Sequence, residues 1–166
     1  MASDVLLRLA VITGNDDYAI KGATPLRALH DLMGRAPAGT GHWLATLDFY
    51  VSVPKEIAIV GARGDPATQR LIDTVFKRYL PNKVVVGTSR GGNPPNPPEI
   101  PLNPALSRRS RGRSTKSAQR GDGGISIPLL EGRDMLNGQP TAYVCQNYAC
   151  RLLVTDPEAL AAQLTA

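Results

Sequence analysis

The stretch EIAIVGARGDPATQRLIDTVFKRYLPNKVVVG, residues 56–87, decides the fold class. Its first six residues form a short apolar run between a proline and a glycine-rich segment, which is typical of a buried strand. Asp65-Pro66 predicts a helix start, with the aspartate as N-cap and the proline at the first helical position. Residues 83–87 predict a second strand. Strand, helix and strand at this spacing predict a parallel, right-handed βαβ unit.

The helix of this unit is expected to present one apolar face to the sheet. That face consists of Leu71, Ile72, Val75, Phe76, Tyr79 and Leu80. The helix is expected to end there, because the following Pro81-Asn82 pair breaks a helix.

Residues 125–166 are expected to complete a small α/β module begun by residues 54–87. Asn137-Gly138 predicts a tight turn, and residues 141–145 predict a further strand, with residues 151–154 as its partner. Asp156-Pro157 repeats the Asp-Pro helix start and predicts the closing helix.

Residues 1–53 are predicted to form stacked helical hairpins. A helix over residues 3–13, with Ser3 as N-cap, is apolar on nearly every face and therefore needs neighbours on more than one side. A second helix contains Pro25, which should kink or split it. A third helix is expected over residues 40–51.

Residues 88–124 differ in kind, because they are rich in proline and then in serine, arginine and glycine. This composition cannot bury enough apolar surface to offset the entropy of ordering, so the segment is predicted to be a disordered insert. It carries seven basic and two acidic residues, which account for the net charge of +5. The arginines could bind nucleic acid through phosphate contacts, but a solvated linker is favoured, because no aromatic residue is interleaved for base stacking.

The 166-residue chain has no apolar run of about 18 residues, so no membrane-spanning helix is expected. With two cysteines and no export signal, a cytoplasmic location is expected. Nucleotide-binding glycine motifs, the zinc-protease motif and the hydrolase serine motif are all absent from the sequence. No cofactor is expected.

Five ordered motifs resemble those of a known family. They are KEIAIVG, YLPNKVVV, IPLLEGR, NGQPTAYVCQNYAC and VTDPEAL. In this order they resemble the C-terminal end of a family of large thioredoxin-domain-containing proteins, the relatives of spermatogenesis-associated protein 20. The upstream stretches DVLLRLAVITGNDDY and GHWLATLDFY resemble that family's preceding helices.

The resemblance implies a longer parent protein, in which a thioredoxin-like domain precedes an α/α toroid similar to six-hairpin glycosidases. Residues 1–53 would then be the closing hairpins of the toroid, and the α/β module would follow them. The implied partners are the parent's N-terminal domains and a carbohydrate-like ligand of the parent. The insert at 88–124 departs from the family pattern.

Cys145 and Cys150, in the pattern C-x4-C, admit three interpretations. Two half-buried thiols that pack as small hydrophobic groups are favoured for a reducing compartment. A disulfide would form if residues 146–149 make a hairpin loop, because the two Cβ atoms would then face each other. A redox role is disfavoured, because thioredoxin-type motifs need C-x-x-C at a helix start. Tyr143 and Tyr148 are expected to pack in the core.

The only histidines, His30 and His42, lie in the helical part, far in sequence from the cysteines, so no metal site is expected. His42 and Asp48 are the candidate catalytic residues, since inner helices of a toroid present polar groups to its pocket. Their six-residue separation places them on different helix faces. A solvent-facing helix start is the favoured interpretation of His42, and His30 is expected on the surface.

The sequence therefore predicts a mixed α+β fragment without catalysis of its own, with a structural or docking role in a longer protein. The alternatives are a pocket wall of a carbohydrate-active or thiol-redox enzyme, and nucleic-acid binding through the insert.

Overall fold

The computed structural model describes residues 2–89, 127–147 and 149–165. Its elements are α1 Ala2–Thr13, α2 Asp16–Ala28, α3 His30–Arg35, η1 Pro37–Gly39, α4 Gly41–Val51, β1 Lys55–Val60, α5 Pro66–Phe76, β2 Lys83–Thr88, η3 Pro128–Leu130, β3 Thr141–Gln146, β4 Ala149–Cys150 and α6 Pro157–Thr165. The predicted mixed α+β class is confirmed. The insert predicted for residues 88–124 lies outside the described residues, except for Thr88 and Ser89.

The four strands form one mixed sheet in the order β2-β1-β3-β4. β1 and β2 are parallel, with Lys55 opposite Lys83, so the predicted parallel βαβ unit is confirmed. β3 pairs antiparallel with β1, and β4 pairs antiparallel with β3. Further along the chain, Val154 bridges Ala142, so part of the predicted strand partner at 151–154 is present.

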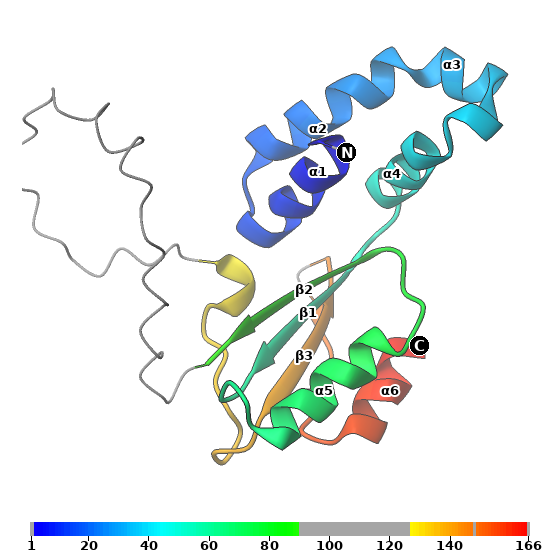
Figure 1. Ribbon diagram of the computed structural model, residues 1–166. Helices are drawn as coiled ribbons and strands as arrows, with labels where there is room; N and C mark the ends of the chain where they lie inside the picture. Colours follow the sequence, from blue (N-terminus) through cyan, green and yellow to red (C-terminus); the bar gives the residue numbers. More distant parts are fainter. Residues whose placement is uncertain (1, 90–126, 148, 166) are drawn as a thin grey trace, which may run out of the picture.

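Helices cover both faces of this sheet (Figure 1). On one face α5 and α6 enclose the α5–α6 core, which consists of Ile57, Ile59, Leu71, Val75, Ala142, Val144, Leu160 and Leu164. On the other face α1, α2, α4 and η3, here called the helical layer, enclose the helical-layer core. That core consists of Leu7, Leu26, Phe49, Ala58, Val84, Val86 and Leu129. Residues 1–53 therefore share a core with the sheet.

The two Asp-Pro helix starts are confirmed. The Asp65 carboxylate accepts hydrogen bonds from the backbone N–H and the hydroxyl of Thr68, each at 2.9 Å. The Asp156 carboxylate accepts one from the N–H of Ala159 at 2.8 Å. Asn137 and Gly138 both have positive φ, as the predicted tight turn requires.

The predicted helix end at residue 80 is wrong, because α5 ends at Phe76. The chain must turn back here to begin β2, and Pro81 also disfavours helical backbone at the residue before it. Tyr79, which follows the helix, is 90% exposed, and Phe76 at the last position of α5 is also exposed, so neither extends the buried apolar face.

The second helix is split, but not at Pro25 as the sequence predicted: α2 runs through Pro25, and Leu29 separates α2 from α3. Ser3 is not an N-cap but a buried residue inside α1. α1 and α2 approach closely at Gly22, where a Cβ atom would lie 2.9 Å from Leu7 Cγ and 3.1 Å from the Ser3 carbonyl oxygen. The predicted cover on every side of α1 is not complete, since Val5 remains 55% exposed.

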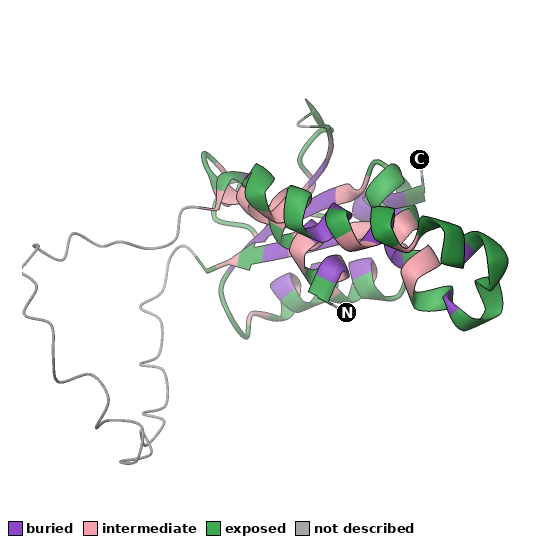
Figure 2. Cartoon of the chain, turned by 90° about the horizontal axis from the view of Figure 1, so that it is seen from above, coloured by how far each residue is buried: buried purple, intermediate pink, exposed green. Residues whose placement is uncertain are grey.

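Seen from above, the buried residues follow the interior between the layers (Figure 2). The end of the helical layer around α3 projects away from this interior and is mostly exposed, with Met33 as its buried residue.

Candidate functional site

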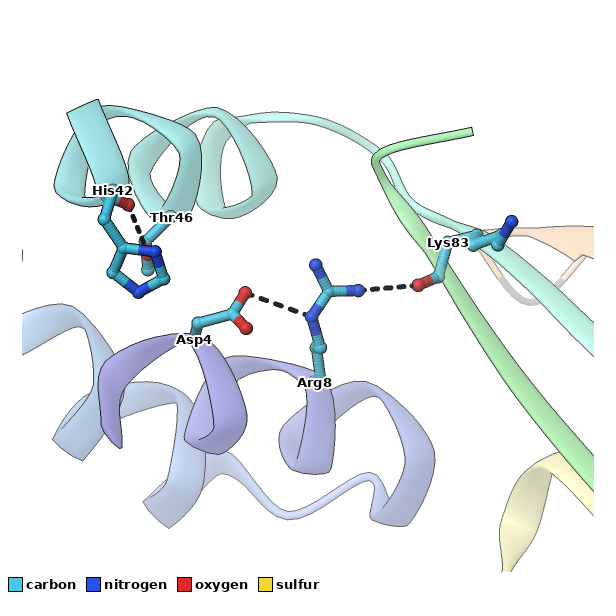
Figure 3. Close-up of polar contacts among 5 residues, drawn as sticks. All are labelled: Asp4, Arg8, His42, Thr46 and Lys83. Atoms are coloured by element: carbon cyan, nitrogen blue, oxygen red, sulfur yellow. Dashed lines mark hydrogen bonds and ion pairs between the residues drawn. The ribbon is translucent and has the colours of Figure 1, made fainter. Parts of the chain in front are cut away.

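The structure does not bring the two catalytic candidates together. His42 is exposed in the first turn of α4, and its ring points toward the first turn of α1 (Figure 3). Asp48 is exposed further along α4 and accepts a hydrogen bond from Asn82 Nδ2 at 2.7 Å. Since one side chain faces α1 and the other the chain before β2, they do not share a pocket.

Arg8 of α1 joins the helical layer to the sheet. Arg8 donates from Nε to Asp4 Oδ1 at 3.0 Å and from Nη1 to the backbone carbonyl of Lys83 at 2.8 Å (Figure 3). Its guanidinium also lies 4.4 Å from the centre of the Phe49 ring. Arg8 therefore ties α1 to both β2 and α4, which is a structural role.

The cysteines lie directly opposite each other on β3 and β4 and form a disulfide. The favoured expectation of two free thiols is therefore wrong for this structure. Gln146 pairs with Ala149 beside the cysteines, and Asn147 adopts a positive φ. The antiparallel pairing of β3 with β4 places the two cysteines face to face. Tyr148 lies outside the described residues.

The disulfide belongs to a group of side chains, here called the cystine cluster: Cys145, Cys150, Arg133, Glu56 and Tyr143. Arg133 Nη2 lies 3.2 Å from Cys145 Sγ and 3.3 Å from Cys150 Sγ. The guanidinium also lies 5.3 Å from the centre of the Tyr143 ring. Glu56 is the residue of β1 that stands opposite Cys145.

Tyr143 positions Arg133 through the backbone as well. Its hydroxyl donates to the carbonyl oxygen of Asp134 at 2.7 Å and accepts from the N–H of the same residue at 3.3 Å. Arg133 is thus held between the ring of Tyr143 and a backbone fixed by its hydroxyl. The expected core packing of Tyr143 is confirmed, since it packs against the helical-layer core.

Burial is the largest cause of the pKa shifts of Glu56 and Arg133 in the cluster. It raises the pKa of Glu56, and the nearby charge of Arg133 opposes that rise. Burial also lowers the pKa of Arg133, against the attraction of Glu56 and Tyr143. The Nη1 atom of Arg133 is buried and has no hydrogen-bond partner within the described ranges.

Sequence reasoning missed Arg133 and Glu56. Arg133 ends the motif IPLLEGR, but its separation from the cysteines gives no spacing signal. Glu56 lies in an apolar run, and only the antiparallel pairing of β1 with β3 places it opposite Cys145.

A second candidate site is an open groove between α3 and α4, here called the α3–α4 groove. Two adjoining hollows of about 490 Å³ and 340 Å³ form it. Both are lined by His30, Asp31, Met33 and Leu47. Leu44 adds to one hollow, and Leu26 and Tyr50 add to the other. The floor is therefore apolar, while the exposed His30 and Asp31, as expected of His30, form the rim.

A third hollow, of about 590 Å³, lies between α5 and β2. Its lining includes Ile72, Phe76 and Val85 with Arg63 at the β1–α5 loop. Within the described parts of the chain, no three His, Cys, Asp or Glu side chains gather as metal ligands. None of the helices described there is long and apolar enough to cross a membrane.

Fold and site together define a small mixed α+β module in which the described residues form a cystine cluster and an apolar groove. The chain is similar to spermatogenesis-associated protein 20 of Homo sapiens, with 31% identity over 152 residues, which are 92% of this chain. The Mus musculus and Rattus norvegicus proteins of the same name are 28% and 27% identical over 152 residues.

The chain spans only 16% of the length of these curated relatives, and the similarity is to their C-terminal part. No protein-family model matches the sequence. No solved structure matches it either.

Proposed function

We propose that this chain is a non-catalytic docking module of a longer protein related to spermatogenesis-associated protein 20. In this proposal the α3–α4 groove receives an apolar helix from the part of that protein that precedes the module. Helix-in-groove contacts of this kind bury one stripe of side chains from the incoming helix.

The apolar floor of the α3–α4 groove carries the proposal. Met33 and Leu26 are buried there, while Leu44 and Leu47 are only partly covered. A helix laid along the groove would remove the remaining apolar surface from water, at about 25 cal/mol per Å². Asp31 and Arg35 lie beside the groove and would contact the polar flanks of the incoming helix.

The outer surface of the helical layer supports the same occupant. Large apolar side chains are exposed on this layer, on the adjoining α3 and on the link from α4 to β1: Val5, Leu9, Ile20, Leu32, Tyr50, Val51 and Val53. Scattered single exposed apolar residues are ordinary, but a whole layer that carries them is typical of a surface that another layer covers. The relatives are about six times longer than the matched segment, so they contain ample chain to supply that layer.

The family resemblance adds detail to the proposal. The preceding part would be an α/α toroid joined to a thioredoxin-like domain, and α1 to α4 would be its closing hairpins. A carbohydrate-like ligand would belong to that toroid. Cytoplasmic location and the disfavoured nucleic-acid role of the insert both stay predictions.

The test measures whether this chain binds the remainder of the human relative when the two are separate molecules. The remainder of the human relative, without its matched C-terminal segment, is immobilised and this chain is applied. We expect binding by the unmodified chain and at least tenfold weaker binding by Leu44→Lys, because a charge would then lie on the groove floor. Leu152→Lys is the matched control, since Leu152 is 85% exposed beside β4, away from the groove. Equal binding by both variants, or none by the unmodified chain, would contradict the proposal.

A further inference from the structure

The cystine cluster has a feature that a purely structural disulfide does not need. A partly buried guanidinium donates toward both sulfurs, at 3.2 and 3.3 Å, although disulfide sulfurs are weak acceptors. The other terminal nitrogen of Arg133 is buried without a partner in the described parts of the chain. A buried donor left unsatisfied costs free energy, so its presence calls for a chemical reason.

The two sulfurs differ in access. Cys145 is 1% exposed, whereas Cys150 is exposed on the short edge strand β4. A thiolate approaching from solvent therefore reaches Sγ of Cys150. Attack at that atom breaks the S–S bond and leaves the electron pair on Sγ of Cys145, next to Arg133.

We propose that Cys145–Cys150 is a thiol–disulfide exchange site for small monothiols, in which Arg133 stabilises the Cys145 thiolate that leaves. This inference is independent of the docking role, because no residue of the cystine cluster lines the α3–α4 groove.

The exchange balances as two successive steps. A monothiolate attacks Cys150 and forms a mixed disulfide, and Cys145 leaves as a thiolate that accepts hydrogen bonds from Arg133. A second monothiolate attacks the monothiol sulfur of the mixed disulfide, which releases the small-molecule disulfide and Cys150 as a thiolate. Two electrons pass from two monothiols to the cystine, and the Cys150 thiolate takes a proton from water.

The surroundings of Cys145 suit this role. Charged and titratable groups face it from the segment after η3 (Arg133), from β1 (Glu56) and from β3 (Tyr143), while Arg151 follows Cys150 in the chain. A cation beside a thiol lowers the pKa of that thiol and improves it as a leaving group. Glu56 opposes the effect, but burial favours its neutral form.

The test uses the full chain and reduced glutathione. Release of thiols is followed by alkylation and mass spectrometry, first without reductant to establish that the two cysteines are joined. Arg133→Gln is expected to slow reduction by about threefold to tenfold, because the leaving thiolate loses its cation. In the reduced protein, the same variant should raise the pH at which Cys145 becomes half-reactive by about one unit.

The matched control is Arg151→Gln, which removes an arginine beside the cystine whose Nη1 donates to the carbonyl of Gln163 and not to sulfur. It should leave both readouts within twofold of the unmodified chain. Arg133→Lys keeps the charge and should recover most of the rate, and it also serves if Arg133→Gln does not fold. The proposal is overturned if Arg133→Gln is reduced as fast as the unmodified chain, if Arg151→Gln slows it equally, or if both cysteines alkylate without reductant.

Discussion

The two faces of the sheet are covered by helices of opposite character. On the α5–α6 face, α5 turns polar groups such as Gln69, Arg70 and Asp73 to solvent, with Phe76 as its exposed large apolar residue. The helical layer has a comparable core beneath it, yet its outer surface exposes Val51 at 70% and Ile20 at 62%. The helices that precede β1 therefore expose more large apolar side chains than α5 and α6 do. The proposed docking role rests on this difference.

The largest expected change in the free energy of unfolding comes from a cavity in the α5–α6 core. Leu160→Ala removes a side chain that is 0% exposed in the α5–α6 core and should cost about 3 kcal/mol of the free energy of unfolding. Leu7→Ala in the helical-layer core should cost less, about 2 kcal/mol, because α1 has room to relax on its open side. Urea unfolding of both variants measures the comparison. Equal losses would show that the helical layer is as closed as the other face.

A smaller effect is expected where α1 crosses α2. Gly22→Ala adds a Cβ atom at 2.9 Å from Leu7 Cγ, so the two helices must separate, at about 1 to 2 kcal/mol. Gly34→Ala is the matched control, because no atom lies within 4 Å of its added Cβ. It should stabilise the chain by about 0.5 to 1 kcal/mol through helix propensity. Thermal unfolding separates the two, and stabilisation by both substitutions would disprove the close α1–α2 crossing.

The smallest effect is a pair of opposite pH dependences. Hydrogen bonds from Thr68 lower the pKa of Asp65, so its contribution to stability is present above its unfolded pKa and is lost as pH falls below about 4. Burial raises the pKa of Glu56, so its contribution is lost as pH rises through the folded pKa.

Two conservative variants separate the pH dependence of stability due to Asp65 from that due to Glu56. Asp65→Asn keeps the capping acceptor and should flatten the acid side of the profile of unfolding free energy against pH. Glu56→Gln should flatten the slope above pH 4 and leave the acid side unchanged. A profile in which either variant parallels the unmodified chain throughout would show that the named carboxyl group does not titrate as described.

Much of the fold could be predicted from the sequence, because local chemistry determines it. Asp65-Pro66 and Asp156-Pro157 specify helix starts, and Asn137-Gly138 specifies a turn, through backbone preferences that need no distant partner. The candidate site could not be predicted in this way. Arg133 and Glu56 meet the cysteines only because β3 lies antiparallel to β1 and the segment after η3 returns over it.

By itself, the sequence determined the mixed α+β class, the parallel βαβ unit and the resemblance to the C-terminal part of a longer family. These depend on periodicity, on caps and on the order of short motifs, which are properties of neighbouring residues. Tertiary structure alone decided that Cys145 and Cys150 face each other beside Arg133, and that one helical layer keeps an apolar outer surface. Each of these depends on which residues distant in sequence share a face, and pairing and packing, not local preference, fix that arrangement.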